Sequence, residues 1–181
     1  MAHVPQLGEL SIGSSSAPVV VVEYASATCS HCAQFHIRVW PQIHTSYIAS
    51  GKVRWIFREL PLDETAMGAF MLARCLPPER FFQTLQILFQ QQKLWAGGER
   101  SARSELFRIM SGAGMKRETF DRCLERSDLA HAIYTIAKTA HEKFDVKGTP
   151  TFFVNGRRVR GAQDLATFKS MLDTALIESG K

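Results

Sequence analysis

The chain has 181 residues, of which 45% are apolar and 22% are charged, and its formal net charge is +5. This length and apolar content suit one domain, or one domain with an insertion, that buries its core without help from a metal. The basic residues are not interleaved with aromatic ones, so nucleic acid is not an expected partner. No apolar run approaches the roughly 20 residues needed to cross a bilayer, and the sequence therefore predicts a soluble chain.

The first strands are predicted before residue 25. An irregular lead over 1–16 contains a short edge strand at Leu10 and Ile12, and the apolar run over 19–24 is typical of a strand buried on both faces. Glu23 interrupts this run, and a carboxylate at the end of a buried strand is costly without a partner or a function. Glu23 is therefore either an ordinary exposed acid at the strand end or a proton acceptor for a nearby group.

A helix is predicted from Cys29 to about Ser50, with Pro41 introducing a kink. Its buried stripe recurs every four residues, at Phe35, Val39, Ile43 and Tyr47. Alternating apolar and basic residues over 53–58 predict a second strand. A strand, a helix and a strand within about 40 residues form a unit whose two strands must be parallel.

Residues 63–127 lose the strand signals and gain helical ones. Apolar periodicity predicts four helices, over 64–76, 80–92, 104–111 and 116–126. We therefore expect a discontinuous main domain, made of residues 1–62 and 128–181, that carries a helical insertion over 63–127.

The C-terminal part is predicted to return to the sheet. Ser127 and Asp128 are expected to cap a long helix that runs to Phe144. Asn-Gly at 155–156 stands between two extended runs and predicts a β-hairpin, whose second strand carries arginines along a solvated edge. A closing helix is expected over 164–179.

The chemistry is expected at Cys29-Ser30-His31-Cys32, where the buried strand gives way to the helix. Two thiols this close can form and exchange a disulfide. Unpaired backbone N–H groups and the positive end of the helix dipole favour an anion at the first turn, which lowers the pKa of a thiol there. Cys29 is therefore the predicted nucleophile, and Cys32, one turn further in, is the predicted resolving thiol.

Two alternative roles exist for this cysteine pair. A zinc site needs about four ligands, usually from two pairs, and no second Cys-x-x-Cys occurs; His36 and His44 do not complete such a site. The pair could also be inert and buried. The strand directly before the motif favours redox chemistry with no metal.

Three segments carry a family resemblance. They are EYASATCSHC over 23–32, FRELPLD over 57–63 and GTPTFFVNG over 148–156. In this order they make the chain resemble the bacterial DsbA family of thiol oxidases over nearly its whole length. The resemblance implies an α/β thioredoxin fold, with a central mixed sheet flanked by helices and an inserted helical domain. Ser30 departs from the proline of many members, so the family's redox potential is not carried over.

The resemblance also implies roles for individual residues. Cys29 would be the exposed thiolate and Cys32 its buried partner, with His31 and the helix N-terminus holding the negative charge. Thr149-Pro150 would have a cis peptide bond, which turns the Thr149 backbone toward Cys29 to bind an extended substrate chain. As a proton acceptor, Glu23 would serve the Cys32 thiol.

The expected partners follow from this resemblance. Unfolded or reduced exported proteins would be the substrates, a membrane quinone reductase of the DsbB type would reoxidise the enzyme, and no small cofactor would be needed. A monomer in the periplasm is expected, with the cytoplasm as an alternative location. The first 18 residues lack the pattern of a signal peptide, and Met1-Ala2-His3 either replaces a removed signal or is the native start.

Cys75 and Cys123 lie on predicted apolar helix faces inside the insertion. A bridge between them would close a loop of about 49 residues and contribute on the order of 4 kcal/mol to stability. Two buried free thiols are the alternative. We expect the bridge, provided that the two Cα atoms lie within roughly 7 Å.

Two rival functions remain open at this point. One is a disulfide isomerase or reductase of the same fold, although such isomerases usually carry an upstream dimerisation domain. The other is a chaperone-like module that binds unfolded chains in a hydrophobic groove, with the thiols incidental. Substitution of Cys29 separates them, because binding would survive in the module and catalysed oxidation would be lost in the enzyme.

Overall fold

The structure is a computed structural model that describes residues 7–97 and 101–180. The strands are β1 (Leu10–Ile12), β2 (Val19–Ala25), β3 (Val53–Glu59), β4 (Thr151–Val154) and β5 (Arg157–Arg160). The helices are α1 (Ser30–Arg38), α2 (Trp40–Ile43), α3 (Glu64–Arg74), α4 (Phe81–Gln90), α5 (Gln92–Trp95), α6 (Ala102–Gly112), α7 (Arg117–Leu124), α8 (Ser127–Phe144) and α9 (Leu165–Glu178). A π-helical turn, His44–Ile48, follows α2, and a 3₁₀ turn, Pro78–Arg80, precedes α4.

The strands form one mixed sheet in the order β1-β3-β2-β4-β5. β2 runs parallel to β3, with Val21 opposite Trp55, and antiparallel to β4. β1 and β5 are antiparallel edge strands. The buried strand predicted from the apolar run is therefore at the centre of the sheet, and the parallel βαβ unit and the mixed sheet are confirmed.

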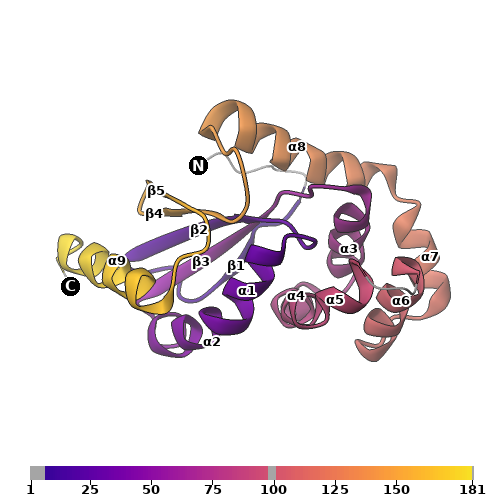
Figure 1. Cartoon of the computed structure of the whole chain (residues 1–181), viewed down its shortest axis with the longest axis horizontal. Coiled ribbons are helices and arrows are strands. Elements are labelled where there is room, and N and C mark those ends of the chain that lie inside the picture. The colour runs from indigo at the N-terminus through magenta and orange to yellow at the C-terminus, as the bar shows by residue number, and fades with distance from the viewer. Residues whose placement is uncertain (1–6, 98–100, 181) are drawn as a thin grey trace.

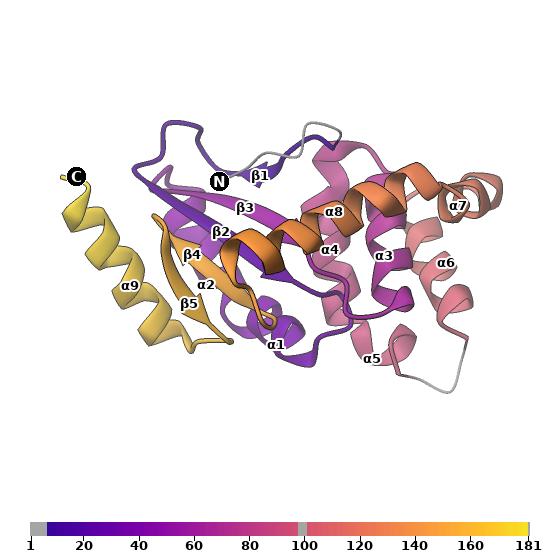
Figure 2. The same ribbon diagram turned by 90° about the horizontal axis from the view of Figure 1, so that it is seen from above.

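Helices cover both faces of this sheet (Figures 1 and 2). On one face, α1, α2 and α9 pack an aromatic core in which the ring of Phe35 lies 4.7 Å from that of Phe152 and 5.1 Å from that of Phe168. On the other face, α8 packs Ile136 onto Val22 and its neighbours. Successive side chains of β2 point to opposite faces, so a continuous valine run supplies both cores.

Helices α3 to α7 gather at one end of the sheet (Figure 1). Their core also includes Phe57 from β3 and Cys32 from α1, so the helical block and the sheet share a continuous apolar interior. Cys75 and Cys123 form a disulfide in this block, with their Cα atoms 6.3 Å apart, which confirms the predicted bridge. The bridge joins the C-terminal end of α3 to α7.

Several boundaries differ from the predictions. The single helix over 29–50 is broken at Val39; Pro41 lies in the first turn of α2, where its missing N–H leaves no gap in the helix. Arg126, rather than Ser127, occupies the N-cap of α8 and makes no side-chain capping bond. The short helix α5 had no sequence signal of its own. The prediction about Met1-Ala2-His3 lies outside the described residues.

The predicted hairpin is present. Asn155 and Gly156 have positive φ values of 44° and 85°, the conformation that a tight two-residue turn requires. Arg158 and Arg160 on β5 pair with Asp145 at 3.1 and 3.5 Å, and Arg157 pairs with Glu178. The arginine-rich segment is thus an ion-paired edge strand. None of the described helices combines the length and apolar character that a membrane span needs.

Removal of the Cys75–Cys123 bridge is expected to lower the free energy of unfolding by about 2–4 kcal/mol, because the unfolded chain regains the entropy of a loop between residues 48 positions apart. The variant is Cys75→Ala with Cys123→Ala, which leaves Cys29 and Cys32 untouched. Urea unfolding monitored by circular dichroism measures the change. A loss below about 0.5 kcal/mol would contradict a stabilising role for the bridge.

Candidate active site

Cys29 lies at the N-cap of α1. β2 ends at Ala25, and a tight turn brings the Cys29 backbone N–H to the Ser26 carbonyl oxygen at 3.2 Å. The backbone at Cys29 is extended, with φ −74° and ψ 119°, and the helix begins at Ser30. An N-cap side chain usually supplies an oxygen that accepts hydrogen bonds from the free N–H groups of the first turn. In this chain a sulfur atom stands in that place.

The local hydrogen bonds favour the ionised form of Cys29. They lower its pKa from an ordinary value of 9.0 to about 5; the main cause is a hydrogen bond from the Cys32 thiol, while burial opposes the shift. The Thr149 side chain and the backbone N–H groups of Cys32 and His31 add to it. In the thiol form, Cys29 Sγ donates to the Thr149 carbonyl oxygen at 3.4 Å. The buried Thr149 hydroxyl has no partner in that geometry and is free to donate to the thiolate.

Cys32 differs from Cys29 in both its burial and the direction of its pKa shift. It is fully buried, and burial raises its pKa well above the ordinary value; the hydrogen bond to Cys29 and the charges of Cys29 and Glu23 raise it further. One half-exposed, acidic thiol thus lies beside one inaccessible, neutral thiol. Of the two sulfurs, only that of Cys29 is accessible from solvent.

The Thr149–Pro150 peptide bond is cis, as the resemblance implied. Thr149 is half-buried and its main chain faces the Cys29 sulfur, while Pro150 is buried beneath it. β4 begins at the next residue, so this loop ends on the strand that pairs with β2. The two loops that meet at Cys29 are therefore anchored on neighbouring strands.

Ser30 and His31 are both exposed at the first turn of α1. The contribution of His31 to the Cys29 pKa comes through its backbone N–H. In the part of the chain that the structure describes, the His31 imidazole makes no hydrogen bond. The imidazole is exposed at the surface, two residues after Cys29.

Glu23 is completely buried under the motif, so its interpretation as an ordinary exposed acid is wrong. Its carboxylate oxygens lie 2.9 and 3.1 Å from His36 Nε2, and one of them accepts a hydrogen bond from Trp55 Nε1 at 3.0 Å. The negative charge of Glu23 contributes to the raised pKa of Cys32. The carboxylate is therefore both partnered and electrostatically coupled to the inner thiol.

The sequence patterns did not identify His36 as a site residue, because the only role they suggested for it was that of a zinc ligand. It is 1% exposed, stacks on Phe89 with ring centroids 4.4 Å apart, and pairs with Glu23. A sequence signal did exist. His36 lies four residues after Cys32 on one helix, and residues at this spacing share a helix face.

Gln92 was also missed, because α5 was not predicted. Its side-chain amide is buried and donates to the carbonyl oxygens of Ala27 at 2.7 Å and Cys29 at 3.0 Å. The Cys29 carbonyl also accepts from the Ala33 N–H within α1. Gln92 thus ties the redox loop to the helical block, and it supplies the partner that the buried Ala27 carbonyl requires.

A second tie runs through the loop between β3 and α3. Asp63 caps α3 by accepting from the Ala66 N–H at 2.7 Å, and its other oxygen accepts from the Thr28 hydroxyl at 2.7 Å. The Ser26 hydroxyl accepts from the Leu62 N–H at 3.3 Å. The residues just before Cys29 are therefore fixed from two directions.

The arrangement can perform thiol–disulfide exchange with its own two sulfurs. That reaction requires an accessible thiolate, a second thiol within bonding reach and a main chain that can align a substrate. Within residues 7–97 and 101–180, no cluster of three or more His, Cys, Asp or Glu side chains is placed to bind a metal ion.

Comparison with known proteins agrees with this geometry. The thioredoxin family model matches residues 6–174. Putative protein-disulfide oxidoreductases of Rickettsia felis and Rickettsia conorii are 30% and 31% identical to this chain, each over 94% of its length. The chain spans 61% of the length of each of these relatives.

Solved structures share the fold almost throughout. The structure of alpha-DsbA1 from Wolbachia pipientis has a TM-score of 0.89 and 29% identity, and the match covers 95% of this chain and 92% of that one. A protein-disulfide isomerase from Novosphingobium aromaticivorans has a TM-score of 0.81 and 25% identity, covering 93% of this chain and 97% of its own.

The alkylation rate of reduced Cys29 is expected to rise with a midpoint near pH 5 and to be constant above about pH 7, because only the thiolate reacts. Iodoacetamide labelling followed by mass spectrometry measures this profile. In Cys32→Ala the midpoint should move toward the ordinary value of 9.0, since the main stabilising hydrogen bond is lost. A wild-type midpoint near 9 would contradict the thiolate assignment.

Substitution Gln92→Leu is expected to lower the free energy of unfolding by about 1–3 kcal/mol, because the buried Ala27 carbonyl loses its hydrogen bond. The matched control is Gln42→Leu at an exposed position, where the change should stay within about 0.5 kcal/mol. Urea unfolding measures both. Equal effects in the two variants would show that Gln92 does not anchor the loop.

Proposed function

Because the chain belongs to the DsbA family of the thioredoxin superfamily, we propose that it is a protein thiol:disulfide oxidoreductase that oxidises thiol pairs in unfolded exported proteins. The observation that carries this proposal is the Cys29 pKa of about 5 beside the buried Cys32 thiol. A stabilised thiolate favours the reduced enzyme, and a disulfide whose reduced form is stabilised is a stronger oxidant.

The stabilisation of the reduced enzyme by the Cys29 thiolate depends on pH. In the unfolded reduced chain Cys29 would ionise near 9.0, and in the folded chain it ionises near 5. The stabilisation of the reduced form is therefore fully present above about pH 9, and it is lost as the pH falls through about 5. At neutral pH much of this stabilisation remains, so reduction of the Cys29–Cys32 disulfide is favoured.

The proposed reaction has two exchange steps. A substrate thiolate attacks Cys29 Sγ in the Cys29–Cys32 disulfide; the S–S bond breaks, its electron pair goes to Cys32, and Cys32 takes up a proton. A second substrate thiolate then attacks the substrate sulfur of the mixed disulfide, and Cys29 leaves as a thiolate. The substrate has lost two electrons and the enzyme has gained them.

Glu23 is proposed as the proton acceptor for Cys32 when the enzyme is reoxidised. Cys32 must then lose its proton before it attacks Cys29, and burial makes this costly. Glu23 is a buried carboxylate whose charge reaches Cys32, and His36 and Trp55 hold it in place. A base in that position lets the proton move without exposing the inner thiol to water.

Thr149 and His31 are proposed to receive the substrate. An extended chain could pair with the Thr149 main chain in the manner of an added strand, which would bring its cysteine to Cys29 Sγ. His31 and Ser30 are exposed in the first turn of α1, next to Cys29, and would contact the same segment. Main-chain pairing of this kind tolerates many side chains, as a general oxidase requires.

The remaining assignments are proposals about the whole protein, which is longer than this chain in the curated relatives. We place it in the periplasm as a monomer, with a DsbB-type quinone reductase in the membrane as its oxidant. Residues 1–62 and 128–181 would form the catalytic domain and 63–127 the insertion. The hydrogen bonds of Asp63 and Gln92 to the redox loop suggest that the insertion holds this loop rather than acting separately.

An isomerase or reductase of the same fold is the main rival, and one structural neighbour is named a protein-disulfide isomerase. An isomerase must resolve its mixed disulfide by attack from either the enzyme thiol or a substrate thiol. A Cys29–Cys32 reduction potential close to that of glutathione permits both. A chaperone-like module is the rival from another class. It would need an apolar surface but no acidic thiol, so the low Cys29 pKa favours the oxidase.

Equilibration with glutathione tests this assignment. The Cys29–Cys32 couple is expected to have a potential more positive than about −180 mV, because thiolate stabilisation favours reduction. A potential near −270 mV would assign the protein to reductases instead. Cys32→Ala is first treated with glutathione disulfide, so that Cys29 carries a glutathione. A substrate thiolate should then displace this glutathione and leave a mixed disulfide at Cys29, visible by mass spectrometry, whereas Cys29→Ala should form none.

A further inference from the structure

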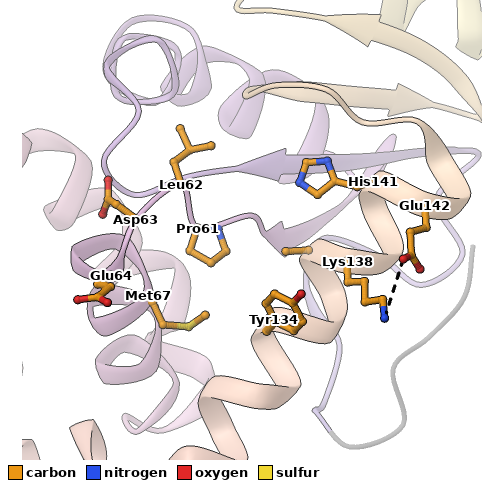
Figure 3. A pocket seen from close by; sticks show the side chains of 10 residues that line it. Pro61, Leu62, Asp63, Glu64, Met67, Tyr134, Lys138, His141 and Glu142 are labelled. Atoms are coloured by element: carbon orange, nitrogen blue, oxygen red, sulfur yellow. Dashed lines mark ion pairs between the residues drawn. The ribbon is translucent and has the colours of Figure 1, made fainter.

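A groove of about 490 Å³ lies between α8 and the segment that joins β3 to α3 (Figure 3). Leu62, Glu64 and Met67 line one wall, and Tyr134 and Glu142 lie on the α8 wall. In Figure 3, Leu62 and His141 lie at one end of the groove, and Met67 and Tyr134 lie toward the other. The reaction proposed above uses none of these side chains.

The groove exposes apolar surface that is held in place. Leu62 and Tyr134 are each 57% exposed, and they are two of the five large apolar side chains that the described residues leave exposed. The Leu62 backbone is fixed by its hydrogen bond to Ser26, and Pro61 precedes it. Keeping two such side chains in water costs free energy that a bound apolar side chain would recover.

Acidic side chains surround this apolar surface. Asp63 and Glu64 lie on one wall, and Glu142 lies on the other, where Lys138 is 3.9 Å from it (Figure 3). Glu64 makes no ion pair or hydrogen bond with any other described residue. The chain as a whole carries a charge of +5, so the groove is an acidic area on a basic protein. Its charge is complementary to Lys or Arg beside an apolar residue.

Hydrogen bonds connect both walls of the groove to the loops that meet at Cys29. Asp63 accepts from the Thr28 hydroxyl at 2.7 Å, and Thr28 directly precedes Cys29. On the other wall, the ring of His141 is 2.5 Å from the Val146 carbonyl oxygen, in the loop that leads to Thr149. A chain bound along the groove would therefore lie beside the loops that carry Cys29 and Thr149.

We propose that this groove binds the stretch of substrate polypeptide next to the reactive cysteine and selects segments in which an apolar residue adjoins Lys or Arg. The proposal rests on the function proposed above and adds a substrate preference to it. The apolar side chain would lie between Leu62 and Tyr134, and neighbouring cations would face Glu64 on one wall and Glu142 on the other.

Two short synthetic dithiol peptides test the preference on the whole oxidised chain. Both carry a Leu near one cysteine, followed by Lys-Arg in one peptide and by Glu-Asp in the other. The measured quantity is the ratio of their kcat/KM values. Both peptides are tested on the same protein, so a change in that protein's redox chemistry affects both kcat/KM values and cancels in their ratio. Wild type is expected to favour the basic peptide about fivefold at low salt, and less in high salt, because exposed charges are screened.

Two double variants separate the groove from general charge effects. Glu64→Gln with Glu142→Gln should bring the ratio to about one. Glu118→Gln with Glu178→Gln removes the same charge from exposed positions on α7 and α9, and should leave the ratio near five. Replacement of the peptide Leu by Ser should raise KM severalfold for wild type, and less for Leu62→Ala with Tyr134→Ala.

Three outcomes would overturn the proposal. They are a wild-type ratio near one, an unchanged ratio in Glu64→Gln with Glu142→Gln, and equal changes in both charge variants. If sedimentation shows a wild-type dimer that Leu62→Ala with Tyr134→Ala dissociates, the groove binds a second copy, which also overturns it. Wild type that oxidises neither peptide nor glutathione refutes the proposed function itself, so the two failures are distinguishable.

Discussion

The structure depends on one unequal pair of sulfurs. Cys29 lies where a helix begins and its N–H groups are free, while Cys32 lies one turn deeper in the apolar core. The same short segment therefore offers a site that favours negative charge next to one that opposes it. The donors of the helix start and of the Thr149 loop serve the outer sulfur, and the apolar core surrounds the inner one.

Holding this segment in place requires groups from every layer of the fold. Gln92 from the helical block reaches its carbonyl oxygens, and Asp63 binds the Thr28 hydroxyl. The loop of Thr149 approaches from the opposite strand. Because the helical block and the sheet share one apolar interior, the block acts as a support for the redox loop.

Burial of Glu23 and His36 costs desolvation free energy unless both side chains have hydrogen-bond partners. Both carboxylate oxygens have partners, and the imidazole stacks on an aromatic ring. A satisfied buried pair commonly contributes little net stability, since desolvation offsets the attraction. The charge of Glu23 contributes to the raised pKa of Cys32, and the proton transfer that we propose rests on this coupling. The groove that we propose for substrate lies between α8 and the segment that joins β3 to α3, where Asp63 also binds the Thr28 hydroxyl.

The sequence by itself determined the order of the elements and the residues at their junctions. Apolar runs and alternation identified the strands, Asn155-Gly156 identified the hairpin, and the strand before Cys29 placed the thiol at a helix start. These features depend on near neighbours in the chain, so a local pattern is enough to predict them. The cis bond before Pro150 was implied by the family resemblance. The Cys75–Cys123 bridge was expected over the alternative of two free thiols.

Only the tertiary structure decided which distant side chains meet. Glu23 pairs with His36 across 13 positions, Gln92 reaches Cys29 across 63, and the groove joins α8 to a loop about 70 residues earlier. No local pattern marks such contacts, because each depends on how layers pack after the elements have formed. The sequence therefore identified the two thiols and the helix start beside them, whereas the packing of the layers determined the environment that shifts their pKa values.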